Sequence, residues 1–170
     1  TESPNTNYVH FRIVESENEH GDDQYSSDFQ GLYLAIEQPD GQFLDEHDLP
    51  DGNFYKIEGN NPESTTNQGP YQVDDRSDAR DFIREFRGNA RPEVEWWKDN
   101  LNLEKYYGYQ TISHAIHHYD TAFGKNFFYY NNPETELWEI HPWDLDLPWA
   151  DNMYGNENHE FNVKVAKNRD

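Results

Sequence analysis

Two aspartates near the end of the chain have the spacing of a reactive site. Asp144 and Asp146 follow a Pro-Trp pair in the segment Trp138–Trp149, which reads WEIHPWDLDLPW. In an extended backbone, residues two apart point to the same side, so both carboxylates can face one pocket. A buried acid is costly unless it is paired, hydrogen-bonded or bound to a metal. The segment therefore predicts a cation site, and a solvated acidic turn at a strand end is the alternative.

Residues upstream supply the other groups that phosphoryl transfer requires. Asp120 closes an apolar-periodic segment, Asn126 follows it, and a hairpin of strands 127–130 and 137–140 is predicted before Asp144. Phosphoryl transfer uses an acid that takes the hydroxyl proton, an Asn that holds a metal, and a second acid that binds metal. Protein kinases space the first two as D-x-x-x-x-N and carry D-F-G after the hairpin. Here the first gap is one residue longer and D-F-G is absent, which excludes a standard kinase.

These positions lead to two geometric expectations. The hairpin should bring Asn126 and Asp144 to one end, within reach of a shared ion at roughly 4–6 Å. Asp120 is expected at a helix C-terminus, where the helix dipole disfavours a carboxylate. A role as the base for a substrate hydroxyl would explain an acid there. Capping of the loop 121–125 through its backbone amides is the alternative.

The order of these motifs resembles the CotH spore-coat kinase family. The resemblance runs from about Tyr8 to Trp149, and its most specific blocks are GLYLAIEQP at Gly31–Pro39 and PWDLD at Pro142–Asp146. The family comprises atypical, secreted or surface-associated kinases with a divergent kinase-like fold that bind ATP with a divalent metal. Supporting matches are Phe43-Leu44, Tyr55-Lys56, Tyr119-Asp120 and Asn126–Tyr129.

The resemblance implies an α+β, divergent protein-kinase-like fold, built from antiparallel strands and hairpins with a few helices and incomplete at both ends. It implies ATP with Mg²⁺ or Mn²⁺ as cofactors, with Ca²⁺ as a further candidate, and a protein substrate or a surface or coat protein as partner. A secreted or cell-surface location is implied as well. Residue by residue, the resemblance makes Asp120 catalytic, Asn126, Asp144 and Asp146 metal ligands, and Lys56 and Glu37 neighbours of the nucleotide phosphates.

The chain departs from the family pattern in three ways. His141 stands where an Ile or similar residue precedes the Pro-Trp pair, and an acidic insertion at 15–28 replaces a short turn. Family domains are also longer on both sides. We therefore expect residues 1–170 to be a single domain that is the central part of a CotH-type kinase-like domain, with a polar tail at 151–170.

The composition excludes several classes of protein. The 170 residues carry 34 acids against 13 Lys and Arg, a net charge of −21. This charge excludes a nucleic-acid binder that neutralises phosphates, and it repels anionic membranes. No apolar run approaches ~18 residues, so no membrane insertion is expected. With no Cys and only 34% hydrophobic residues but 16% aromatics, the core must be built from Tyr, Phe and Trp.

Local patterns predict the elements that position the site. We expect strands at 8–14, 29–38 and 54–58, a turn at 39–41 and a loop at 63–71. Helices are expected from Asp75 or Ser77 to Phe86, after Pro92, and from Leu103 to Tyr119. The last helix is predicted to bury Leu103, Tyr106, Tyr107, Ile112, Ala115, Ile116 and Tyr119.

Several residues have two interpretations. Lys56, the only Lys before Lys98, can bind phosphate or pair with a local acid, and Glu37 can pair with Lys56 or Arg12. A metal site at the histidines 114, 117 and 118 lacks the helical Glu of H-E-x-x-H, so packing or hydrogen bonding is expected instead. For the whole chain, the alternative to an atypical kinase is a non-catalytic, extracellular acidic module that binds calcium or a partner in a surface assembly. In that module Asp144 and Asp146 would be structural ligands.

Overall fold

The computed structural model describes residues 1–13, 29–88, 92–121, 124–146 and 148. It divides into two compact units, one of Pro4–Gln38 and one of Thr1–Ser3 with Pro39–Asp170. The predicted acidic insertion at 15–28 and the polar tail at 151–170 lie outside the described residues. Among the described residues the elements are mixed α and β with antiparallel sheets, as predicted.

The first unit is a two-stranded antiparallel hairpin of β1 (Thr6–Arg12) and β2 (Phe29–Ile36). Both strands were predicted from their β-branched and aromatic residues. Val9 pairs with Tyr33 and Tyr8 with Leu34, and all four side chains are exposed. The ribbon therefore carries large apolar side chains on both of its faces.

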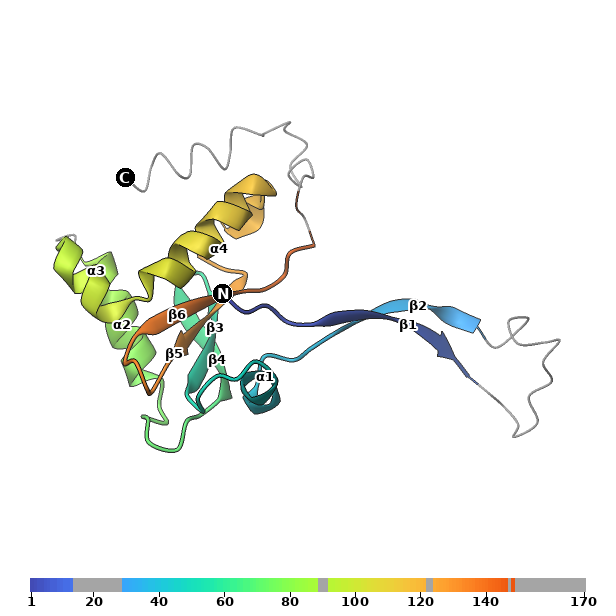
Figure 1. Ribbon diagram of the computed structural model, residues 1–170, viewed down its shortest axis with the longest axis horizontal. Coiled ribbons are helices and arrows are strands. Elements are labelled where there is room, and N and C mark those ends of the chain that lie inside the picture. The colour runs from blue at the N-terminus through green and yellow to red at the C-terminus, as the bar shows by residue number, and fades with distance from the viewer. Residues whose placement is uncertain (14–28, 89–91, 122–123, 147, 149–170) are drawn as a thin grey trace. The chain divides into compact units, whose positions relative to one another are not determined.

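The second unit is built on a four-stranded antiparallel sheet in the order β4-β3-β5-β6 (Figure 1). Its strands are β3 (Asn53–Glu58), β4 (Asn61–Asn67), β5 (Phe127–Asn131) and β6 (Trp138–Pro142). The predicted hairpin of β5 and β6 is confirmed, with Tyr129 opposite Ile140. The loop expected at 63–71 is wrong for its first half, because β4 lies there as an edge strand. Its polar side chains suit an edge, and Pro62 lacks an N–H that a central strand would need.

The alternation of side chains along the strands gives the sheet two apolar faces. On one face Tyr55 and Ile57 of β3 join the helices α2 (Ser77–Arg87), α3 (Val94–Asn100) and α4 (Leu103–Ala115). Phe82 of α2 stacks on Trp138 at 4.8 Å between ring centroids. On the other face Phe54, Phe128 and Tyr130 pack against α1 (Gly41–Glu46), which lies apart from the other helices (Figure 1). The core is aromatic, as the composition predicted.

Two helix expectations need correction. Residues 39–41 begin a helix rather than only a turn, because the Asp40 carboxylate accepts the N–H groups of Gln42 and Phe43 and caps α1. The last helix ends at Ala115, and Tyr107 and Ile112 on it are exposed.

The buried residues of α4 are instead Tyr109 and Ser113. The Asn102 N–H donates to the Trp138 carbonyl oxygen at 2.8 Å, and the Asn102 side chain caps the helix at Lys105. These contacts with β6 determine which side of α4 faces the sheet, and the apolar periodicity of the sequence did not predict that side. No helix of the described part is long and apolar enough to cross a membrane.

Candidate functional site

The candidate site lies at the end of the sheet where β5 begins and β6 ends. The Trp143 N–H donates to the Asn126 carbonyl oxygen at 3.2 Å, so the residues that precede β5 and follow β6 are joined. The Trp143 ring packs edge-on against Phe128 at 5.5 Å. The hairpin therefore sets Asn126 beside the chain that leads into Asp144, at the end where they were predicted.

Both of these residues have a left-handed backbone. The φ angle is 64° at Asn126 and 57° at Asp144. This region is uncommon for residues other than Gly, although Asn and Asp tolerate it best. Such conformations persist where the surrounding structure holds them, and they concentrate at binding and active sites.

Asp120 and Asn126 are brought together by a direct hydrogen bond. The Asn126 Nδ2 donates to Asp120 Oδ2 at 2.7 Å, and the Lys125 Nζ lies 3.1 Å from Asp120 Oδ1. Asn126 is only 4% exposed, and its Oδ1 accepts no hydrogen bond from the part of the chain that is described. Within the described residues, that oxygen is therefore available to a cation.

The expected position of Asp120 at the end of the long helix is wrong. It lies in a 3-10 turn, Tyr119–Thr121, that follows the end of α4 at Ala115. The helix dipole therefore gives no reason to assign Asp120 a catalytic role. Its contacts with Asn126 and Lys125 are the structural evidence that bears on that role. Sequence reasoning missed Lys125, for which the only signal was a single cation between Gly124 and Asn126.

Asp144 and Asp146 are exposed, so the expectation that they point into a buried pocket is wrong. The chain leaves the sheet after Pro142, and the Trp143 ring packs against Phe128. Their charges still act on the site. Burial lowers the pKa of His118, and the negative charges of Asp120, Asp144 and Asp146 oppose that shift.

His118 is a buried polar residue whose pKa is affected by the charges of the candidate site. It is 2% exposed, and neither ring nitrogen has a hydrogen-bond partner among the described residues. Because burial lowers its pKa, the ring is neutral at physiological pH. Among the described residues, His114, His117 and His118 do not form a metal-ligand group.

The two residues expected near nucleotide phosphates have local partners. Lys56 projects from β3 and pairs with Glu63 of β4, with Nζ and Oε2 3.0 Å apart. Glu37 belongs to the hairpin unit, where its Oε2 accepts the Asn5 N–H at 2.8 Å. For Lys56, the structure therefore has the local ion pair that was one of its two interpretations.

A contact from the β3–β4 turn holds the loop that carries these side chains. The Asn60 N–H donates to the Gly124 carbonyl oxygen at 2.8 Å. Gly124 has a φ of 69°, and a Cβ there would overlap the Asn60 side-chain oxygen. The hydrogen bond from Lys125 to Asp120 raises the pKa of Lys125, and Glu58 at the end of β3 adds to this. The turn and the loop are therefore one connected substructure.

A second charged cluster lies at β6, away from the residues singled out above. Lys105 Nζ is 2.6 Å from Glu139 Oε2 and 2.7 Å from Glu2 Oε2. His141 completes the cluster, with Nδ1 3.1 Å from the Glu2 carbonyl oxygen. Ligand atoms of Glu2, Glu139 and His141 lie within 4.8 Å of one another, but the Lys105 ammonium already forms an ion pair with each of the two carboxylates. We therefore describe the cluster as an ion network that anchors residue 2 to the sheet.

Glu139 is the most strongly perturbed acid of this network. Burial raises its pKa, and His141, Lys105 and Asn132 together lower it to about 2. The His141 Nε2 lies 3.7 Å from the carboxylate, which is longer than a hydrogen bond, so we assign most of the effect to Lys105. From the sequence, His141 was noted only as a departure from the family pattern, and its place in this ion network was not predicted.

Comparison with known proteins places the chain in a family. A family model described as CotH kinase protein matches residues 1–169. The chain is also 24% identical over 143 residues to inner spore coat protein H of Bacillus subtilis (strain 168). That match covers 74% of this chain and 39% of the relative, so the chain spans less than half of the relative's length. A match over nearly all of its residues shows that the chain belongs to the CotH kinase protein family.

Proposed function

We propose that this chain is the central part of an ATP- and divalent-metal-dependent protein kinase with a divergent kinase-like fold. Its acceptors would be Ser or Thr hydroxyls of coat or surface proteins. The carrying observation is the 2.7 Å hydrogen bond between Asn126 and Asp120, beside the backbone contact from Asn126 to Trp143. These two contacts support the proposal because they join Asp120 and Asn126 at the end of the sheet from which the chain continues to Asp144. Family membership supports the same reaction.

The residues at this end fit a hard divalent cation. Asn126 Oδ1 and the carboxylates of Asp144 and Asp146 are oxygen ligands of the kind that Mg²⁺ and Mn²⁺ prefer. Mg²⁺ keeps several water or phosphate ligands, which the exposure of both aspartates allows. When bound, metal-ATP would supply the transferable phosphoryl group. In a chain of net charge −21, the cation would also reduce repulsion of the nucleotide.

Asp120 would accept the proton of the substrate hydroxyl. Asn126 and Lys125 each bind one of its carboxylate oxygens, so the group is held in a single orientation. Each oxygen keeps a second lone pair that can take a proton. Orientation of this kind is what a general base needs, and general bases contribute typically 10²–10⁴-fold to rate.

Lys56 would reach the nucleotide phosphates by leaving Glu63. The side chains of this pair are 35% and 50% exposed, and an exposed ion pair contributes at most about 1 kcal/mol. Exchange of Glu63 for a phosphate is therefore inexpensive. Glu37 is proposed as a further residue near the nucleotide on the family resemblance alone.

The test is nucleotide binding and phosphoryl transfer by the full-length protein. We expect calorimetry to detect ATP binding that requires Mn²⁺ or Mg²⁺, and Asp144→Asn to weaken it at least 10-fold. The exposed Asp99→Asn on α3 is the matched control and should bind as the wild type does. Asp120→Asn should retain ATP and lose transfer from labelled ATP by 10²–10⁴-fold. Normal turnover in folded Asp120→Asn would refute the catalytic assignment.

A second candidate function is a non-catalytic acidic module that binds calcium or a protein partner. The exposure of Asp144 and Asp146 favours it, because exposed carboxylates on a chain of charge −21 attract calcium without a nucleotide. Calcium binding with no detectable ATP binding would select this function. A coat or cell-surface location belongs to either proposal and rests on the name of the Bacillus relative.

A further inference from the structure

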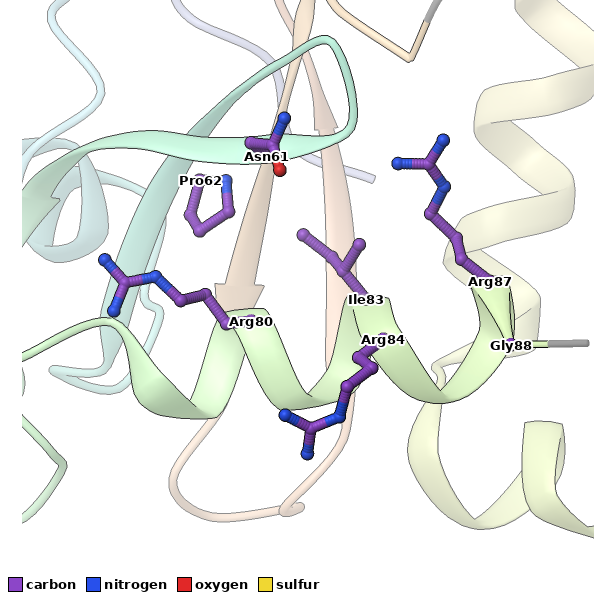
Figure 2. Close-up of a pocket in the computed structure, with 7 residues that line it drawn as sticks. All are labelled: Asn61, Pro62, Arg80, Ile83, Arg84, Arg87 and Gly88. Atoms are coloured by element: carbon purple, nitrogen blue, oxygen red, sulfur yellow. The ribbon is translucent and has the colours of Figure 1, made fainter.

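Helix α2 gathers positive charge in a protein that has little of it. Arg80, Arg84 and Arg87 line a cavity of about 400 Å³ together with Asn61, Pro62, Ile83 and Gly88 (Figure 2). The whole chain has 13 Lys and Arg against 34 acids. Basic residues in the last turn of a helix are favoured by its dipole, which accounts in part for Arg84 and Arg87. It does not account for Arg80, which lies further from the helix end.

Two of the arginines face the cavity without an ion pair to a carboxylate of the described residues. Arg84 carries its own counter-ion, Asp81, at 2.8 Å. Arg80 donates to the Asp75 carbonyl oxygen at 3.1 Å, and Arg87 makes no hydrogen bond or ion pair within the described residues. Arg80 and Arg87 are seven residues apart, which is two turns or roughly 10.5 Å along the axis. Among the described residues of this surface, Arg87 is therefore the cation without a hydrogen bond or ion pair, whereas Arg80 is held by the Asp75 carbonyl oxygen and attracted by the Asp75 carboxylate.

The floor between these two cations is apolar. Ile83 is 6% exposed and Pro62 is buried, and Figure 2 shows the Arg80 and Arg87 side chains on either side of Ile83, toward Pro62 and Asn61. The guanidinium group of Arg84 points away from Pro62 and Asn61 (Figure 2). A ligand seated here would place an anionic group between the guanidinium forks and an apolar stem on Ile83.

We propose that this cavity binds a phosphorylated Ser or Thr residue of a peptide. A guanidinium group donates parallel hydrogen bonds that match phosphate oxygens, and a phosphate dianion can serve two such forks where a carboxylate serves one. The methylene stem and neighbouring side chains of a peptide would cover the apolar floor, which inorganic phosphate would leave exposed. Arginine clusters are the usual means of recognising phosphorylated segments.

This inference rests on the proposed function, since a protein kinase of this kind produces the ligand. The cavity is also linked to the candidate site. Asn61 lines it, and the preceding residue, Asn60, donates its N–H to Gly124 in the loop between Asp120 and Asn126. A phosphorylated segment bound on α2 would therefore steady the turn that holds that loop. The segment could come from this chain or from a substrate.

Fluorescence polarisation with the full-length protein tests the proposal. The probes are a labelled synthetic peptide with one phosphoserine among Ala and Leu residues, its unphosphorylated twin, and a version with Glu at that position. We expect the phosphopeptide to bind at least 10-fold more tightly than either. Arg80→Gln/Arg87→Gln should remove at least 10-fold of that affinity, and Lys98→Gln on α3 should leave it within 2-fold. Arg80→Lys/Arg87→Lys, which keeps the charge without the fork, should fall between.

The outcomes separate this site from the kinase activity, because the peptide is already phosphorylated and no ATP or metal is added. Equal affinity for the Glu peptide would overturn the phosphate assignment. Full affinity in folded Arg80→Gln/Arg87→Gln, checked by thermal unfolding, would overturn the site. In a separate competition measurement, displacement of the peptide by ATP alone would also overturn the site. Competition by a phosphorylated peptide of this chain's own sequence, compared with one from a substrate, identifies the natural source of the ligand.

Discussion

Removal of the Lys105 ammonium should destabilise the protein strongly, because it leaves a buried carboxylate without its main partner. Glu139 is 2% exposed, and its pKa is lowered from 4.5 to about 2 although burial acts in the opposite direction. At 1.36 kcal/mol per pKa unit, that shift corresponds to about 3 kcal/mol of stability at pH 7. Loss of one partner of a buried pair typically costs 3–5 kcal/mol. We therefore expect Lys105→Met to lower the free energy of unfolding by about 3 kcal/mol.

The same pKa predicts a dependence on pH. The folded pKa of Glu139 lies below its unfolded value, so its contribution is complete above pH 4.5 and is lost as the pH falls toward about 2. Wild type should lose stability in this window. Lys105→Met, in which the carboxylate is no longer favoured, should show a smaller loss there. The difference in the free energy of unfolding between wild type and Lys105→Met should thus be smaller at pH 3 than at pH 7.

Urea unfolding at pH 7 and pH 3 measures both effects. Lys98→Met is the matched control, because its pair with Glu95 on α3 is exposed at 57% and 76% and should be worth less than about 1 kcal/mol. Lys105→Met/Glu139→Gln removes the charge together with its partner and should recover most of the loss. If Lys105→Met unfolds within 0.5 kcal/mol of wild type at pH 7, the reasoning about the buried cluster is refuted.

Two further predictions concern packing. Gly124→Ala should destabilise the chain by about 1–3 kcal/mol in thermal unfolding, because φ is 69° there and the new Cβ overlaps the Asn60 side chain. Asn60→Gly in that background should restore part of the loss, and no effect of Gly124→Ala would contradict the loop geometry. Phe82→Ala should cost about 3–5 kcal/mol in urea unfolding, because Phe82 is 5% exposed and stacks on Trp138. Tyr71→Ala, at a residue 96% exposed, should change stability by less than about 0.5 kcal/mol, and equal losses for both would disprove this core.

Local patterns were sufficient for the elements with strong periodicity or clear turn signals. The strands of the β1–β2 and β5–β6 hairpins and the helix that begins at Ser77 were predicted because their apolar spacing and flanking turn residues lie within a few positions. The same was true of the short helix after Pro92. The position of Asn126 beside the end of β6 followed from the predicted hairpin, whereas its hydrogen bond to Asp120 was not predicted.

Other features depended on contacts with residues far away in the sequence, which local patterns do not predict. The edge strand β4 has polar residues that favour a loop, and it is a strand only because β3 lies beside it. The burial of Tyr109 rather than Tyr107 follows from the contact of α4 with β6. The exposure of Asp144 follows from where β6 ends.

The sequence alone was enough to predict the charge balance and the aromatic core, because both are properties of composition. It was also enough for the strands of the two hairpins and for the family resemblance, because these rest on short motifs of residues close along the chain. Only the folded structure decided which charges meet. Lys105 reaches Glu139, 34 positions away, and Glu2, 103 positions away, and the arginines of α2 line one cavity with Pro62 of β4. Such contacts depend on how the sheet and helices pack. Packing is stabilised by contacts between segments that are far apart in the sequence, and local periodicity does not specify those contacts.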